Sequence, residues 1–166
     1  MRSSDSPLSI RELILFGILG AMIFAMKMVM AALPNIEPVS LCLLVFGAVF
    51  GYKALYPVFV YVTLEILCFG LGIWNVYYLY VWPMLVLIAI FLRDMQQPLS
   101  GVYGLLFGAL CGIADIFIGG FGFAISKWAS GIPFDIAHCV GNFCIALVLF
   151  KPLRELVEKL YRKMKR

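Results

Sequence analysis

The chain of 166 residues is 64% hydrophobic and 13% charged, with a formal net charge of +4 and a mean hydropathy of +1.03. Soluble domains contain about 45–50% apolar and about 25% charged residues, so this composition excludes a water-soluble globular protein. We expect an all-α integral membrane protein that lies in the lipid bilayer and has no nucleic-acid partner.

Apolar stretches, taken in chain order, predict a bundle of six transmembrane helices. About 20 residues are needed to cross the hydrocarbon core of a bilayer. The first stretch is longer than the apolar core of a signal peptide, so we expect it to remain as a helix. The expected helices cover about 10–33, 39–51, 53–69, 74–92, 100–118 and 134–150, and a basic amphipathic tail covers 151–166. The glycine-rich segment 119–133 is expected to be an outer loop.

The apolar block 39–70 is interrupted at Lys53, and its division into two helices is the least certain step. Its first piece, at about 12 residues, would reach only about 18 Å of the roughly 30 Å core. Charge favours the division, because six spans place Arg2, Arg11, Lys53, Arg93 and the basic tail on one side of the membrane. The positive-inside rule makes that side cytoplasmic. Both termini are therefore expected in the cytoplasm of a multi-pass protein of the cell membrane.

A few ionisable residues remain near the outer ends of the predicted helices, among them Lys27, Glu65 and Asp115. A charge in hydrocarbon costs at least about 2.5–3.5 kcal/mol, so such residues normally face the interior of a bundle and pair there. Lys27 could pair with Glu65 or with Asp115 and only stabilise the fold. Alternatively, some of these groups hold a polar ligand.

The last predicted helix carries Asp135, His138 and Asn142 at i, i+3 and i+7, which places the three on one face. Three polar side chains exceed what one ion pair needs, so this stripe favours a ligand site. His138 is the only histidine, and the sequence has no H-x-x-x-H or C-x-x-C spacing. Transition-metal sites normally use three or four converging nitrogen, sulfur or carboxylate donors, so no metal is expected.

Aromatic residues gather at the same side of the predicted bundle. Trp74, Tyr78 and Trp82 have i, i+4, i+8 spacing, with Asn75 among them, and Trp128 lies in the last predicted outer loop. They could form an interfacial belt that anchors helix ends. They could also form a stacking wall for a flat ligand. Trp82 is too deep for a belt, which favours a pocket or the core for this residue.

Two rows of small residues recur at four-residue intervals, a pattern that lets helices approach closely in lipid. The rows are Gly17, Ala21 and Ala25 in the first predicted helix and Gly104, Gly108 and Gly112 in the fifth. Packing within the chain or against a partner would explain either row.

Motifs for catalysis are missing from the sequence. It has no nucleotide-binding loop, no G-x-S-x-G and no H-E-x-x-H, so we expect neither an enzyme nor a bound cofactor. The chain also lacks the inverted repeats of a self-sufficient secondary transporter. Whatever it moves or binds, another protein is expected to supply the energy.

The helix 1 row Ala21-Met-Ile-Phe-Ala25 and the segments Pro34 to Val39 and Ser130 to His138 are similar to stretches of one family. Together with six expected helices and cytoplasmic termini, they resemble the substrate-binding S component of energy-coupling factor (ECF) transporters. The resemblance covers essentially the whole chain and leaves the subfamily open.

The resemblance implies capture of a vitamin or related micronutrient at the outer face of a prokaryotic cell. It also implies that Gly17, Ala21 and Ala25 dock on a transmembrane coupling subunit driven by two ATPases. The ligand contacts that it implies are Asn35, Glu37, Trp74, Asn75, Tyr78, Trp128, Asp135, His138 and Asn142. The alternative is a small structural or assembly protein without a ligand, whose charges are internal ion pairs.

Overall fold

The computed structural model describes residues 7–30 and 38–165. Within these ranges the protein is all-helical, with 91% helix and no strand. Four helical stretches are long and apolar enough to cross a membrane: Ile10–Val29, Pro38–Phe69, Ile73–Phe91 and Phe107–Met164. The expectation of an all-α protein with helices that are long and apolar enough to span a membrane is therefore confirmed.

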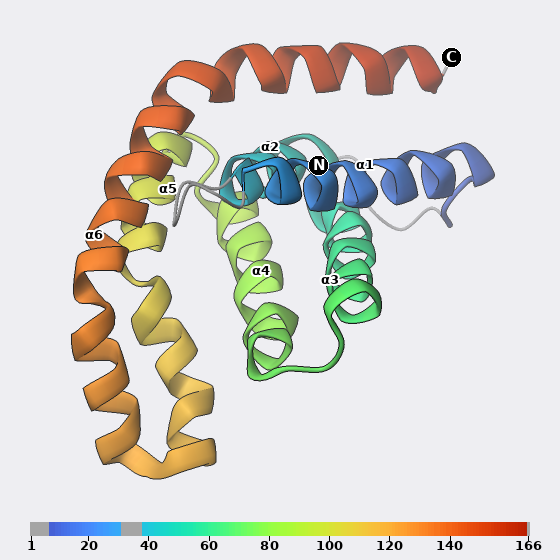
Figure 1. Ribbon diagram of the computed structural model, residues 1–166. Helices are drawn as coiled ribbons and strands as arrows, with labels where there is room; N and C mark the ends of the chain where they lie inside the picture. The colour runs from blue at the N-terminus through green and yellow to red at the C-terminus, as the bar shows by residue number, and fades with distance from the viewer. Residues whose placement is uncertain (1–6, 31–37, 166) are drawn as a thin grey trace.

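The helices follow one another with short connections. They are α1 (Ile10–Val29), α2 (Pro38–Phe50), the 3₁₀ turn η1 (Gly51–Ala54), α3 (Leu55–Phe69), α4 (Ile73–Phe91), α5 (Gln96–Leu105) and α6 (Phe107–Met164). The path of α6 is broken at Gly120, where φ is 81° and ψ is 173°. As Figure 1 shows, α5 and the first arm of α6 run beside the returning arm, and the C-terminal end of α6 turns over the end of the bundle and runs beside α1.

The segment 119–133, expected as a loop, is helical except at Gly120. Glycine has no Cβ, so Gly120 adopts its positive φ without strain and turns the chain within one residue. Lys127 and Trp128 consequently lie on a helix that joins the two arms, not on a loop (Figure 1).

The core of the bundle is built around α2, in which every residue from 38 to 47 is buried. This helix packs against α4 and α6, and less extensively against α1 and α5. A helix that is apolar on all sides belongs in the centre of a bundle, where its 13 residues are covered by the neighbouring helices. The break between α2 and α3 falls at η1, close to the expected division at Lys53.

Glycines set the closest approach between α5 and the arms of α6. A Cβ atom on Gly104 would lie 2.8 Å from the backbone carbonyl of His138, and one on Gly108 would lie 2.5 Å from Asp135 Oδ2. A Cβ atom on Gly112 would have no neighbour within 4 Å. Two of the three members of this row therefore serve packing within the chain.

The small residues of α1 are used differently. Gly20 faces α3, where a Cβ atom would lie 2.6 Å from Val60 Cβ. Gly17 has no neighbour within 4 Å of such an atom, and Ala21 and Ala25 are exposed. The predicted docking row thus lies on a face of α1 that the bundle leaves uncovered.

The replacement Gly104→Ala is expected to lower the free energy of unfolding by about 1–3 kcal/mol, because the added methyl group meets a backbone that cannot rotate away. The matched control is Gly112→Ala in the same row. The added methyl group enters open space, and alanine is a better helix former than glycine. The free energy of unfolding is therefore expected to stay the same or to rise slightly. Chemical unfolding in detergent micelles checks both variants, and equal losses would contradict the close packing at Gly104.

Candidate functional site

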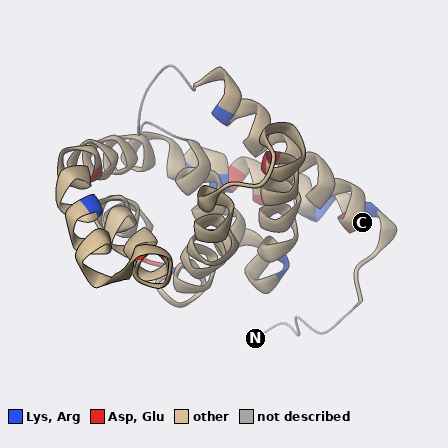
Figure 2. Ribbon diagram, turned by 60° about the horizontal axis from the view of Figure 1, so that its bottom comes forward, with Lys and Arg blue, Asp and Glu red and all other residues tan. Residues whose placement is uncertain are grey.

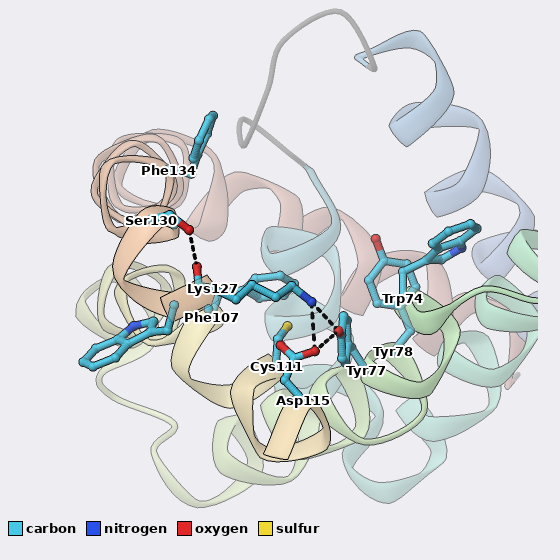
Figure 3. A pocket seen from close by; sticks show the side chains of 12 residues that line it. Trp74, Tyr77, Tyr78, Phe107, Cys111, Asp115, Lys127, Ser130 and Phe134 are labelled. Atoms are coloured by element: carbon cyan, nitrogen blue, oxygen red, sulfur yellow. Dashed lines mark hydrogen bonds and ion pairs between the residues drawn. The ribbon is translucent and has the colours of Figure 1, made fainter. Parts of the chain in front are cut away.

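A cavity of about 370 Å³ opens between α4 and α6 (Figure 3). Its size falls in the range of about 300–1,000 Å³ that is typical of small-molecule sites. The lining residues are Trp74, Tyr77, Tyr78, Phe107, Gly108, Cys111, Asp115, Lys127, Trp128, Ser130, Gly131 and Phe134. Aromatic rings dominate this list, and the few polar groups are concentrated on one wall.

That wall is a closed hydrogen-bond network of three side chains, drawn with dashed lines in Figure 3. Lys127 Nζ lies 2.9 Å from Asp115 Oδ1 and donates to the Tyr77 hydroxyl at 2.6 Å. The Tyr77 hydroxyl in turn donates to Asp115 Oδ1 at 2.5 Å. An ammonium group has three N–H donors, so Lys127, whose side chain is 44% exposed, retains one for an acceptor in the cavity.

A second ion pair supports Tyr78 from behind the cavity. Lys27 Nζ lies 2.9 Å from Glu65 Oε2 and donates to the Tyr78 hydroxyl at 3.1 Å. The ammonium group also lies 4.9 Å from the centre of the Tyr78 ring, a favourable cation–π distance. Of the two partners considered for Lys27, the structure selects Glu65, and Asp115 pairs with Lys127 instead.

The predicted stripe of Asp135, His138 and Asn142 is buried along one face of α6, as expected from its spacing. Asp135 Oδ1 accepts a hydrogen bond from the backbone of Gly108, which lines the cavity. Asp135 Oδ2 is buried and makes no hydrogen bond with the described residues, although the Trp128 side chain lies near this carboxylate. The stripe therefore begins directly behind the cavity wall.

Deeper in the bundle, the same stripe is only partly satisfied. The His138 ring meets Phe107 edge to face at 5.0 Å, and its buried Nε2 has no partner among the described residues. Asn142 Nδ2 donates to Ser40 Oγ at 3.1 Å, while its Oδ1 has no such partner. Buried polar atoms are usually paired, and His138 contacts the lining residue Phe107, so its unpaired Nε2 favours a ligand or water site behind the cavity.

The remaining predicted contacts separate into three groups. Trp74, Tyr78 and Trp128 line the cavity, whereas Asn75 is buried at the start of α4, where its Oδ1 accepts from the Gly72 backbone at 2.7 Å. Asn75 thus caps the helix. The other two predicted contacts, Asn35 and Glu37, lie outside the described residues.

Trp82 lies in the core, between the rings of Tyr78 and Phe107, each with its centre 5.5 Å away. Its burial excludes a place in an interfacial belt, as its depth in the sequence indicated. Through these two neighbours it supports the aromatic wall of the cavity.

The sequence-based set of contacts did not include Tyr77, Asp115 or Lys127, which form the polar wall. The signal for the two charged residues was present, because both are ionisable groups beside apolar stretches. Tyr77 had no separate signal, since it is one of several tyrosines in the same turn of α4.

A separate cluster of charged residues lies at the end of the bundle opposite the cavity. Glu12 is buried near the start of α1, and its carboxylate lies 3.1 Å from Lys53 Nζ and 3.5 Å from Lys165 Nζ. The Tyr161 hydroxyl donates to Glu12 at 2.5 Å. Figure 2 shows how few charged positions the helices carry, which makes such a cluster conspicuous. It ties α1, η1 and the end of α6 together.

Within residues 7–30 and 38–165, no group of three His, Cys, Asp or Glu side chains is placed to hold a metal ion. The chemical capacity of the cavity is therefore stacking, ion pairing and hydrogen bonding. Comparison of the chain with protein-family models, with curated proteins and with solved structures finds no match.

Proposed function

We propose that the protein is the substrate-capture subunit of an ECF-type importer, which binds a vitamin or related micronutrient at the outer face of a prokaryotic membrane. The observation that carries the proposal is the cavity between α4 and α6, with aromatic walls, an ion-paired polar wall and the unpaired Asp135 oxygen behind it. In this role it delivers the ligand through a coupling subunit powered by two ATPases.

The proposal includes six spans, with α5 and the first arm of α6 forming the fifth and the returning arm the sixth. Support comes from the Glu12 cluster, which gathers the start of α1, η1 and the end of α6 at one end of the bundle. That end carries Lys53 and the basic tail, as a cytoplasmic end should. The cavity, with Trp74 at the start of α4, then opens outside.

The lining favours a compact ligand with a flat ring and both donor and acceptor groups. Trp74, Tyr78 and Trp128 supply stacking surfaces, and Lys127 can donate to a carbonyl or carboxylate. Asp135 does not line the cavity, but its unpaired Oδ2, behind the lining residue Gly108, is an acceptor for an N–H group that reaches it. Pyridine or pyrimidine vitamins and their precursors have this chemistry.

A thermal-shift screen of vitamins, vitamin precursors and modified bases tests the proposed function with the purified protein. We expect one chemical class to raise the unfolding midpoint, and a membrane coupling subunit with two ATPases to co-purify from the native host. Absence of both results would contradict the proposal.

The double variant Ala21→Leu/Ala25→Leu is expected to abolish co-purification of the coupling subunit without changing the unfolding midpoint. Both alanines are exposed on the uncovered face of α1, so larger side chains there block a close helix contact but disturb no packing within the chain. The control is Ala137→Leu, an exposed alanine on α6, which should co-purify normally. Equal co-purification of all three proteins would exclude this face as the docking surface.

One observation favours the alternative, a structural or assembly protein. Lys27 is paired with Glu65 and Lys127 with Asp115, so each ammonium group has its counter-charge without a ligand. Such a protein needs its buried polar groups only for stability, so variants in the stripe should change stability and no uptake. The unpaired oxygen of Asp135 favours the transport function because it lies directly behind the lining residue Gly108. Glu65 Oε1 is also unpaired, but it lies on α3, which contributes no residue to the lining.

A further inference from the structure

The C-terminal segment of α6, residues 151–164, is a basic element that ligand capture leaves unexplained. In Figure 1 it turns away from the preceding arm and runs across the end of the bundle beside α1. Tyr161 holds it there, because its ring meets Phe50 edge to face at 4.9 Å and its hydroxyl bonds Glu12. A helix that crosses the end of a membrane bundle lies at the level of the lipid headgroups.

The segment has two different apolar surfaces. Leu153 and Val157 pack against the core of the bundle. A second surface, here named the tail face, points away from the core and consists of Leu156, Lys159, Leu160 and Lys163. These residues have i, i+3, i+4 and i+7 spacing and so share one side of the helix. The two leucines are 52% and 56% exposed, and both lysines are exposed.

The tail face belongs to a segment that is basic as a whole. Residues 151–165 include six basic and two acidic side chains. Arg162 is paired with Glu158 at 2.6 Å and Lys165 with Glu12, whereas Lys159 and Lys163 have no ion pair within the part of the chain that the structure describes. Two unpaired ammonium groups therefore flank two exposed leucines.

This combination matches the boundary between lipid headgroups and acyl chains. Leucine side chains at this depth enter the acyl region, while lysine stems extend so that the ammonium groups reach the phosphates. Clusters of basic residues next to membrane spans attract anionic lipids. We propose that the tail face binds the headgroups of anionic phospholipids at the cytoplasmic surface of the membrane.

The proposal needs the segment to lie at a membrane surface, and it is independent of ligand capture. Bound lipid would hold residues 151–164 across the bundle and thereby support the contact of Tyr161 with Glu12. Anionic lipid is thus expected to stabilise the end of the bundle opposite the cavity.

Native mass spectrometry of the full-length protein in detergent tests the proposal by titration with dioleoyl phosphatidylglycerol, compared with dioleoyl phosphatidylcholine. The wild-type protein is expected to bind the anionic lipid more tightly. The variant Lys159→Gln/Lys163→Gln should weaken that binding about thirtyfold, which corresponds to about 1 kcal/mol per lysine. Binding of phosphatidylcholine should not change.

The matched control is Arg93→Gln/Lys151→Gln, which removes the same charge from exposed positions outside the tail face. It should retain most of the affinity, and both double variants should keep the wild-type unfolding midpoint. Equal affinity of the wild-type protein for the two lipids, or equal losses in the two variants, would overturn the proposal. So would unchanged lipid binding by Lys159→Gln/Lys163→Gln with loss of a co-purifying protein, since the tail face would then be a protein interface.

Discussion

Replacing Glu12 with glutamine is expected to lower the free energy of unfolding by about 3 kcal/mol, because the change removes the counter-charge of a largely buried lysine. The side chains of Glu12 and Lys53 are only 5% and 12% exposed, and Lys53 Nζ lies 3.1 and 3.2 Å from the two carboxylate oxygens. The same carboxylate accepts from Tyr161. One substitution therefore weakens the junction of α1, η1 and the end of α6. Chemical unfolding in detergent micelles measures the effect.

The control for this prediction is Glu158→Gln, which breaks the exposed pair with Arg162 and should cost less than about 1 kcal/mol. The double variant Glu12→Gln/Lys53→Gln should recover part of the loss, because it leaves no uncompensated ammonium group. If Glu12→Gln were no more harmful than Glu158→Gln, the cluster would not be structurally important.

Features that depend on spacing within one helix could be predicted from the sequence. Asp135, His138 and Asn142 share a buried face, and Trp82 lies in the core, as helical periodicity indicated. The choice of partner between helices could not be predicted, since it depends on the order in which helices pack. Lys27 had two plausible acidic partners in the sequence, and only the contact of α1 with α3 selects Glu65.

The helical state of segment 119–133 was the main error in the predicted fold. Four glycines lie in this segment, and glycine is a poor helix former in water. Helix propensity is only a weak preference, however, and packing overrides it here, because the helical segment buries Ala124 and brings Lys127 to Asp115. Only Gly120 departs from helical geometry. The low helix propensity of glycine therefore led to the wrong prediction of a loop.

The same difference explains why the polar wall of the cavity was incomplete in the predicted site. Assigning Lys127 to a loop separated it from the helices, whereas the joining helix places its ammonium group against Asp115 and Tyr77. The cavity is consequently built where this helix meets α4. Its position depends on a turn at one residue, Gly120, that composition alone did not locate.

Replacing Asp135 with asparagine is expected to separate ligand binding from stability. Asparagine can still accept from the Gly108 backbone, and it removes a buried charge whose Oδ2 has no hydrogen bond among the described residues. The free energy of unfolding should rise by about 1 kcal/mol, because an uncharged amide costs less to bury than a carboxylate that has no ion pair among the described residues. Affinity for the ligand found by thermal shift should fall tenfold to a hundredfold, as a hydrogen bond to a charged group contributes about 1.5–3 kcal/mol.

The contrasting variant is Glu65→Gln, which removes the counter-charge of Lys27 behind the cavity. It should lower stability and retain most of the ligand affinity, because Glu65 lies on α3, which contributes no residue to the cavity lining, whereas Asp135 bonds the lining residue Gly108. If Asp135 holds a ligand, calorimetric titration should show lost affinity only for Asp135→Asn, and unfolding should show lost stability only for Glu65→Gln. If Asp135→Asn instead lowered stability and left binding and uptake unchanged, the stripe would be structural and the assembly-protein alternative would be favoured.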